Sequence, residues 1–208
     1  MSQFFQIHPD NPQHRLIGQA ANMVRAGGII VLPTDSCYAL ACRLDDKGAA
    51  DRLRRIRQVD AKHHLTLLCR DLREIASYAH LDNTQFRMLK AAMPGSFTFI
   101  LEATKEVPRR LSHPSRKTIG LRIPANRIIQ TFLEEVGGPL LGTTLIMPGE
   151  TDPLTDPEVI REKLDKLVDV IVDGGACGLV PTTVIDLTGK EPLLVRRGGG
   201  DASVFGLS

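Results

Sequence analysis

The sequence predicts one α/β domain built on a mixed β-sheet. Apolar runs of strand type alternate along the chain with segments of helical spacing, which is the pattern of an α/β layered fold. Some predicted strands follow each other without a helix between them, so we expect a mixed rather than a purely parallel sheet. A length of 208 residues and a hydrophobic content of 42% fit a single domain, residues 1–208, with a substantial core.

The predicted helices carry recognisable start and stop signals. A glycine pair ends the first helix, and Asp71 with Glu74 fits a capping box at the start of the third. Asn126 and Asp156 are predicted N-caps, the latter followed by a proline and an acidic residue of the first turn. The helices are predicted over residues 16–26, 46–56, from 72, over 83–92 and 127–136, and from 157.

Strands are predicted where short apolar runs end at proline, glycine or polar residues. After the last of them comes a run of three glycines, so we expect residues 199–208 to form a loose tail behind a motif-bearing core of residues 17–198. The strands are predicted over residues 29–32, 65–69, 97–101, 119–123, 140–145, 168–172, 183–187 and 193–195.

Charge is spread unevenly over a chain whose net charge is only +2. Residues 52–70 hold five Arg and one Lys against one acid, and residues 105–127 hold five Arg and two Lys against one acid. Two basic segments on a nearly neutral protein indicate a patch for phosphates, if folding brings the segments together. Solvated helix faces are the plainer alternative.

Several classes of protein are excluded by what the sequence lacks. It has no GxxxxGK[ST] loop, no GxGxxG after a strand, no HExxH and no GxSxG, and its four cysteines and six histidines show no zinc spacing. No apolar run approaches the roughly 18 residues that span a bilayer, and the first residues do not resemble a signal peptide. We therefore expect a cytoplasmic protein with reduced cysteines, no bound metal of its own and no membrane partner.

Small polar residues that directly follow strands are the strongest candidates for a binding site. The run Pro33-Thr34-Asp35-Ser36 comes after a buried strand, at the kind of position where open α/β sheets bind small ligands. Arg122 lies inside a predicted strand, and alternation places it on the face opposite the apolar residues. An arginine held on a sheet can bind a carboxylate or a phosphate through two parallel donors. Ordinary turn residues and a structural ion pair are the alternatives.

Taken in order, these motifs resemble those of the YrdC-like threonylcarbamoyl-AMP synthase family, and most closely its YciO branch. The resemblance covers residues 17–198. Residues 33–40 (PTDSCYAL) are similar to the family's PTDTVYGL, 55–57 (RIR) to KxR, 94–98 (PGSFT) to PGPxT, and 121–124 (LRIP) to its RxP strand. Residues 139–150 lie over PLxxTSANxSG, 181–186 (PTTVID) over PSTVVD, and 194–198 (LVRRG) over ILRxG.

The resemblance implies a three-layer domain with a twisted mixed sheet and a concave basic face. It implies a cleft that holds ATP with Mg²⁺ and L-threonine, and a reaction that joins threonine, bicarbonate and ATP into threonylcarbamoyl-AMP with release of pyrophosphate. That product feeds the t6A modification of tRNA, and the family is also linked to double-stranded RNA. By position, the threonine contacts would be Thr34, Arg122 and Thr182. The nucleotide contacts would be Arg55, Arg57, Thr118, Thr144 and Arg196.

This chain departs from the family pattern at three places. Arg55 stands where the family has lysine, Ile146 where TSAN has asparagine, and Pro148 where the family has serine. Losing one polar contact in a desolvated site costs about 1–3 kcal/mol, or roughly ten- to a hundredfold. The expectation is therefore a protein that binds ATP or AMP and double-stranded RNA or tRNA, with weak or altered adenylate chemistry. A non-catalytic RNA-binding module and a full synthase are the alternatives.

Overall fold

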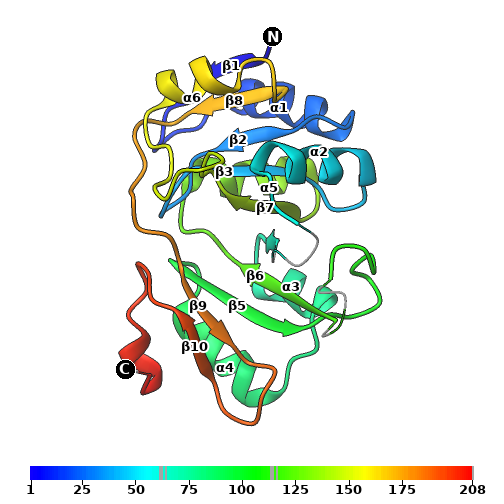
Figure 1. Cartoon of the computed structure of the whole chain (residues 1–208), viewed down its shortest axis with the longest axis vertical. Coiled ribbons are helices and arrows are strands. Elements are labelled where there is room, and N and C mark those ends of the chain that lie inside the picture. Colours follow the sequence, from blue (N-terminus) through cyan, green and yellow to red (C-terminus); the bar gives the residue numbers. More distant parts are fainter. Residues whose placement is uncertain (61–62, 64, 113–114, 116, 208) are drawn as a thin grey trace.

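A ten-stranded mixed sheet forms the centre of the computed structural model, which describes residues 1–60, 63, 65–112, 115 and 117–207. The strand order is β1-β8-β2-β3-β7-β4-β6-β5-β9-β10, with parallel and antiparallel neighbours (Figure 1). The strands are β1 Gln3–Gln6, β2 Ile30–Leu32, β3 Ala39–Arg43, β4 Thr66–Leu68, β5 Phe97–Glu102, β6 Thr118–Arg122, β7 Leu140–Thr144, β8 Val170–Asp173, β9 Thr183–Asp186 and β10 Leu193–Arg196. The predicted mixed α/β sheet is confirmed.

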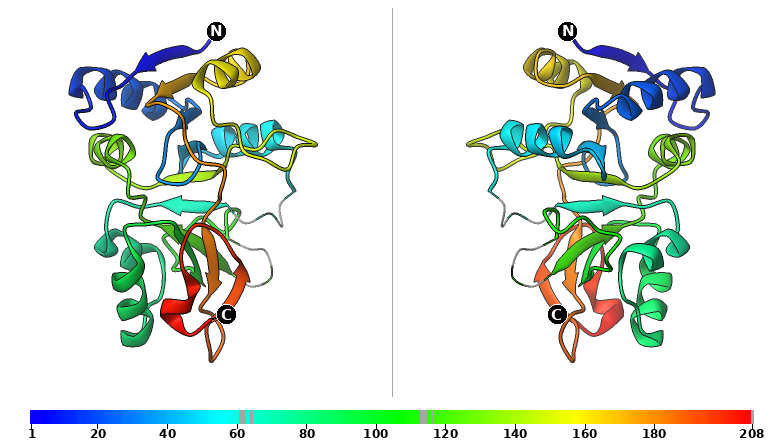
Figure 2. Two further views of the ribbon diagram at one scale, coloured as in Figure 1. Left: turned by 90° about the vertical axis from the view of Figure 1, so that its left-hand side faces the viewer. Right: turned by 90° about the vertical axis from the view of Figure 1, so that its right-hand side faces the viewer.

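Helices cover the sheet on both faces, giving three layers (Figure 2). Two of them, α1 and α5, pack on one face of the β1-β8-β2-β3-β7 half, while the other four contribute to the core on the opposite face. The helices are α1 His14–Arg25, α2 Lys47–Arg57, α3 Leu72–Tyr78, α4 Asn83–Ala92, α5 Arg127–Val136 and α6 Pro157–Leu164. Within the described ranges, none of them is long and apolar enough to cross a membrane.

The predicted helix caps are formed by the expected side chains, with one difference. Asn126 and Asp156 accept backbone N–H groups at the starts of α5 and α6. Asp71 accepts the N–H of Glu74, but the Glu74 carboxylate accepts the N–H of Arg70, so the reciprocal half of the capping box is displaced by one residue. A complete capping box, which sequence inspection missed, stands at Asp82 before α4.

Strands β1 and β3 were not predicted from sequence, and the C-terminal segment is not loose. Residues Ala202–Phe205 form a 3₁₀ helix. The ring of Phe205 meets the rings of Phe97 and Phe99 edge-on, at centroid distances of 5.7 and 6.0 Å. Edge-to-face packing of this kind stabilises a segment beyond the apolar area that it buries, so the prediction of a loose tail over residues 199–208 is wrong for this stretch.

One face of the sheet stays open beyond β7. Along β4, β6 and β5, the residues Leu67, Leu121 and Phe99 belong to the core, and their neighbours in sequence point the other way. On that other face, the core cluster that α1 and α5 form reaches no further along the sheet than Leu68 of β4. The exposed stretch of sheet is therefore left as the floor of a cavity.

Candidate functional site

The open face of the sheet forms a cavity of about 390 Å³. Its floor comes from alternate residues of β4, β6 and β5. Gly120 of β6 and Gly142 of β7 also line the cavity, and neither has a side chain that would fill it. A Cβ built on Gly120 would lie 3.1 Å from Oγ1 of Thr66 and 3.3 Å from Cγ2 of Thr98. The cavity therefore has its depth because these two strand positions carry no side chain.

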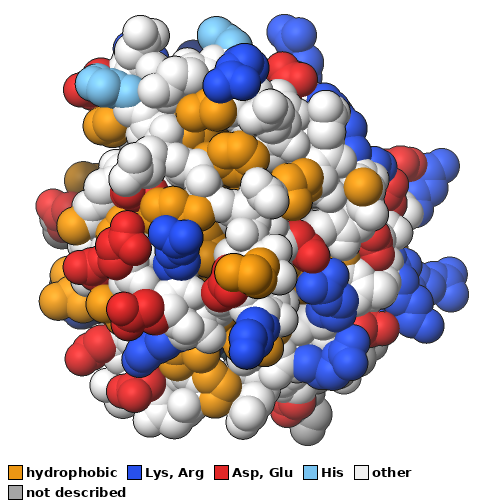
Figure 3. Space-filling model, turned by 90° about the horizontal axis from the view of Figure 1, so that it is seen from above, with side chains coloured by type: hydrophobic (Ala, Val, Ile, Leu, Met, Phe, Trp, Pro, Cys, Tyr) orange, Lys and Arg blue, Asp and Glu red, His pale blue; other side chains and the backbone are white. Residues whose placement is uncertain are grey.

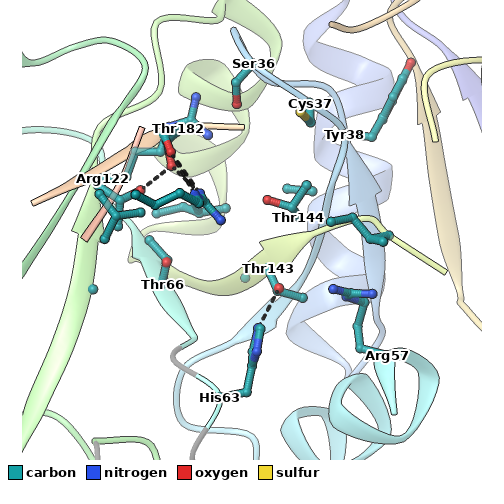
Figure 4. A pocket seen from close by; sticks show the side chains of 18 of the residues that line it. Ser36, Cys37, Tyr38, Arg57, His63, Thr66, Arg122, Thr143, Thr144 and Thr182 are labelled. Atoms are coloured by element: carbon teal, nitrogen blue, oxygen red, sulfur yellow. Dashed lines mark hydrogen bonds between the residues drawn. The ribbon is translucent and has the colours of Figure 1, made fainter. Parts of the chain in front are cut away.

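Three arginines from three elements place positive charge around the cavity. Arg122 comes from β6, Arg196 from β10 and Arg57 from the last turn of α2. Figure 4 shows Arg122 and Thr182 on one side of the cavity and Arg57 on the other. Burial lowers the pKa of all three guanidiniums, yet arginine stays protonated at neutral pH. The site is suited to an anionic ligand, and the predicted concave basic face corresponds to this cavity.

Arg122 forms a buried ion pair with Asp35. Its Nη2 lies 2.6 Å from Oδ1 of Asp35, which also accepts the backbone N–H of Ala125 at 2.9 Å. The other carboxylate oxygen accepts the hydroxyl of Ser96 at 3.0 Å. The negative charge of Asp35 partly offsets the effect of burial on the pKa of Arg122. One carboxylate thus joins the loop after β2 to the segments that flank β5 and β6, and it fixes the guanidinium in place.

Three buried polar side-chain atoms have no hydrogen-bond partner within the described part of the chain. They are Nε of Arg57, Nε of Arg122 and Oγ1 of Thr118. Buried polar groups in native proteins are almost always paired, so each unpaired atom calls for an explanation. Arg57 and Arg122 line the cavity, and Thr118 lies on the same face of β6 as Gly120 and Arg122. The unpaired donors of the two arginines are explained if a ligand with acceptor oxygens completes the site.

Of the eight residues predicted for the site, five line the cavity: Arg57, Arg122, Thr144, Thr182 and Arg196. Thr182 shares a hydrogen bond with Thr98, hydroxyl to hydroxyl at 2.8 Å, and its backbone carbonyl accepts Nη2 of Arg196 at 2.9 Å. Thr182, which directly precedes β9, and Arg196 of β10 are thereby held against β5 at the cavity wall.

Thr34, Arg55 and Thr118 are not among the lining residues. The Thr34 hydroxyl donates to the backbone carbonyl of Cys37 at 2.6 Å and accepts the N–H of Ser36 at 3.1 Å, so it shapes its own loop. Arg55 faces away from the cavity, because residues two apart on a helix point in different directions. A ligand contact from Thr34 stays a prediction.

Sequence inspection placed Asp35 in the candidate loop of residues 33–36 without a role of its own, and it gave no role to His63. Asp35 sits among turn residues, and its partner Arg122 is 87 residues away, so nothing local signalled the pair. Nε2 of His63 lies 3.4 Å from the Thr143 hydroxyl at the cavity (Figure 4). The second basic segment includes residues 113–114 and 116, and the first includes 61–62 and 64, which lie outside the described residues.

No thiol of the described chain is set up as a nucleophile. Cys37 lines the cavity, and burial raises its pKa although the charge of Arg122 opposes this effect. Burial also raises the pKa of Cys42 to about 12 and that of Cys177 to about 11. The thiolate is the reactive form of cysteine. Among the described residues no group of three or more His, Cys, Asp or Glu is placed to hold a metal ion. The groups that the cavity presents are fixed charges and hydrogen-bonding side chains.

A ten-stranded mixed α/β sheet with an arginine-lined cavity on its open face defines the class of protein, and comparison identifies the family within that class. Residues 22–198 match the Sua5/YciO/YrdC family, which is described as "Telomere recombination". The chain belongs to this family. It is 55% identical to the Escherichia coli K12 protein YciO, itself described as uncharacterized, over 99% of this chain and 100% of that protein.

Solved structures agree with this assignment. The crystal structure of E. coli YciO matches with a TM-score of 0.96 over 99% of this chain. Pyrococcus abyssi Sua5 in complex with L-threonine matches with a TM-score of 0.88 and 25% identity, over 95% of this chain and 58% of that one. The threonylcarbamoyl-AMP synthase of P. abyssi is 28% identical over 182 residues, and the chain spans about half of its length (53%).

Proposed function

We propose that the cavity binds ATP or AMP together with a small carboxylic acid such as L-threonine, and that the protein carries out weak or altered threonylcarbamoyl-adenylate chemistry. The observation that carries the proposal is the pair of unpaired buried donors, Nε of Arg57 and Nε of Arg122, in one cavity. Leaving a buried donor unsatisfied costs about 1–3 kcal/mol. Ligand oxygens that accept these two bonds would recover that free energy, which gives binding a physical reason.

The residues that line the cavity can be assigned to two groups, one for the carboxylic acid and one for the nucleotide. Arg122, fixed by Asp35, would hold the carboxylate of the acid, and Thr182 beside it would contribute a hydroxyl. Arg57, Thr144 and Arg196 would face the nucleotide phosphates. Support for this division comes from P. abyssi Sua5, a family relative solved with L-threonine, and from a related protein described as threonylcarbamoyl-AMP synthase.

Adenylate formation would place an oxygen of the threonine carbamate on the α-phosphorus of ATP, with pyrophosphate as the leaving group. Preorganised cations aimed at the charge that develops on the leaving group accelerate such a transfer without any covalent enzyme intermediate. Mg²⁺ accompanying ATP would offset phosphate charge, and it would be held by the phosphates themselves. The chain's own contribution is to hold the acid and the nucleotide in line, using Arg122 on one side of the cavity and Arg57 on the other.

Ile146 is the reason for proposing weak or altered chemistry. Its side chain lines the cavity beyond Thr144, where the synthase pattern has an asparagine. An aliphatic side chain offers neither a donor nor an acceptor there, and a loss of about 1–3 kcal/mol, roughly ten- to a hundredfold, follows for a contact made in the transition state.

The test is to supply the purified protein with labelled threonine, bicarbonate, ATP and Mg²⁺, and to read the products by chromatography. We expect slow adenylate formation, or hydrolysis of adenylate added from outside. Rapid and complete conversion would show a full synthase. If neither reaction occurs and calorimetry detects no binding of AMP or ATP, the proposal fails.

Duplex RNA binding is a second candidate, supported by the distribution of surface charge. On the face seen from above in Figure 3, most of the visible Lys and Arg side chains lie toward one side and many of the visible Asp and Glu side chains toward the other. Helix α2 contributes Arg52, Arg54 and Arg55 to the surface. Binding through phosphates releases counterions and weakens steeply with salt. We expect RNA affinity to fall with salt and with Arg55→Glu, and an affinity that neither treatment changes would exclude this function.

A further inference from the structure

The sheet ends at β10, an edge strand with a neighbour on one side only. Among the described residues, β10 pairs with β9, and no other backbone hydrogen bond reaches residues 193–196. Figure 1 shows β10 beside β9 at the lower end of the molecule. The outer side of such a strand presents unpaired N–H and C=O groups, which can pair with a strand from another chain.

Exposed apolar side chains are concentrated in the same part of the chain. Nine large apolar side chains of the described residues are exposed, and five of these belong to residues 179–204: Leu179, Val180, Leu193, Val195 and Val204. On β10 itself, Leu193 is 62% exposed and Val195 is 53% exposed. Natural edge strands are commonly protected by charged side chains, and none lies between these two residues. An exposed apolar edge of this kind indicates an interaction surface.

Leu193 and Val195 lie on the same side of the sheet. Val195 lines the cavity, as does Val184 of β9. Asp186 is two residues after Val184 and therefore on the same face, and Leu193 is its partner in the register of the two strands. A register shift next to Val195 marks a β-bulge, which bends the strand. A strand that adds to this edge can therefore pair with it only over a short length.

We infer that β10 pairs antiparallel with β10 of a second copy of this chain, across a two-fold axis at Leu194. In a two-fold interface, a contact from one residue to another occurs twice, once in each direction. With the axis at Leu194, Leu193 of each copy stands opposite Val195 of the other. Apolar pairs that face each other across two strands stabilise the pairing of those strands.

Charge complementarity favours a second copy of the chain as the partner. In the same register, Glu191 of each copy stands opposite Arg197 of the other. Both side chains are exposed, and within the described ranges neither forms an ion pair. A shift by one residue would instead set Leu193 opposite Leu194, which packs against the core on the other face. One register thus aligns the apolar pair and the charged pair together.

The experiment is sedimentation velocity of the full chain over about a hundredfold range of concentration. Because a short edge contact buries little surface, we expect a reversible passage from monomer to dimer. Leu193→Lys places a charge on the edge and should weaken dimerisation about tenfold or more. Leu167→Lys is the matched control, since Leu167 is another exposed leucine but lies between α6 and β8, in the other half of the sheet. It should dimerise like the wild type.

An exchange of charges tests the register. Glu191→Arg places an arginine opposite Arg197 of the other copy, and Arg197→Glu places a glutamate opposite Glu191. Each variant alone should dimerise about tenfold more weakly than the wild type. An equimolar mixture of the two variants sets opposite charges against each other at both positions, so it should restore the dimer. Mixing would not repair a folding defect, so restoration would come from the contact itself.

A wild type that stays monomeric over the whole range would overturn the inference and would leave the edge to a different chain. A dimer that Leu193→Lys leaves intact would also overturn it, because the dimer would then use another surface. If the two charge variants are each monomeric and remain so when mixed, the register is wrong and the inference fails. The outcome does not depend on the proposed function, because no ligand takes part in the measurement.

Discussion

Separating Asp35 from Arg122 should destabilise the protein more than removing both charges together. The two side chains are only 13% and 7% exposed, and their nearest charged atoms are 2.6 Å apart. Asp35→Asn would leave the guanidinium buried without a counterion, and Arg122→Gln would leave the carboxylate. Breaking a buried pair in this way costs about 3–5 kcal/mol.

The two single variants should not be equal. After Arg122→Gln, the Asp35 carboxylate still accepts the Ser96 hydroxyl at 3.0 Å and the Ala125 N–H at 2.9 Å, so this variant should fall near 3 kcal/mol, the lower end of the range. After Asp35→Asn, the buried Arg122 guanidinium loses the charge of its ion-pair partner, and its Nε has no hydrogen-bond partner to compensate. This variant should therefore lose about 5 kcal/mol of stability, the upper end of the range.

The assay is a double-mutant cycle from urea unfolding of the wild type, both single variants and the double variant. We expect the double variant to be at least 2 kcal/mol more stable than the sum of the two single effects predicts, because no uncompensated charge remains in it. For a domain of this size the single variants should lower Tm by roughly 6–20 °C. Single effects below about 1 kcal/mol, or effects that simply add, would refute the argument that the pair is buried and coupled.

Four further predictions follow from the structure. Gly120→Ala should abolish nucleotide binding measured by calorimetry and leave the fold intact by circular dichroism, because its Cβ occupies the cavity floor. Gly138→Ala, whose Cβ meets nothing within 4 Å, should bind like the wild type, and equal binding by both variants would contradict the role of the floor. Ile146→Asn should raise adenylate formation about tenfold, and unchanged turnover would mean that this position does not limit the reaction. Phe205→Ala should cost about 2 kcal/mol in urea unfolding, and a value near zero would mean that the C-terminal 3₁₀ helix does not stabilise the core. The N–H of Glu74 lowers the pKa of Asp71, so Asp71→Asn should cost about 0.5 kcal/mol at pH 7. That difference should vanish as the pH falls below about 4, through the lowered pKa, and its persistence at pH 2 would exclude a charge effect.

Helices with clear cap and stop residues were predicted correctly from the sequence. Helix α5 begins after Asn126 and ends at Gly137, which adopts a φ of 78°, as the cap and stop residues indicate. Strand β3 was missed because it is buried on both faces and contains small residues, so it shows no alternation of polar and apolar side chains. Strand β1 was missed because both of its ends are exposed glutamines.

The direction in which a side chain points could be predicted where the geometry of a single strand or helix determines it. Alternation within β6 was enough to place Arg122 on the face that became the cavity floor. Helical geometry allows only one of Arg55 and Arg57 to face the cavity, and family motifs alone did not say which. The partnership of Asp35 with Arg122 depends on how the loop after β2 meets the far end of β6, a tertiary contact that no local pattern encodes.

Strand β4 makes the site unusually sensitive to the length of the chain. It has three residues, of which Thr66 and Leu68 face the cavity while Leu67 packs into the core, and it pairs with β7 on one side and β6 on the other. Inserting a single residue into it would turn the central residue toward the cavity and its two neighbours into the core. In the strand order of the described residues, β4 lies between β7 and β6 and so joins the two halves of the sheet. Such an insertion would therefore exchange cavity floor and core at the middle of the sheet.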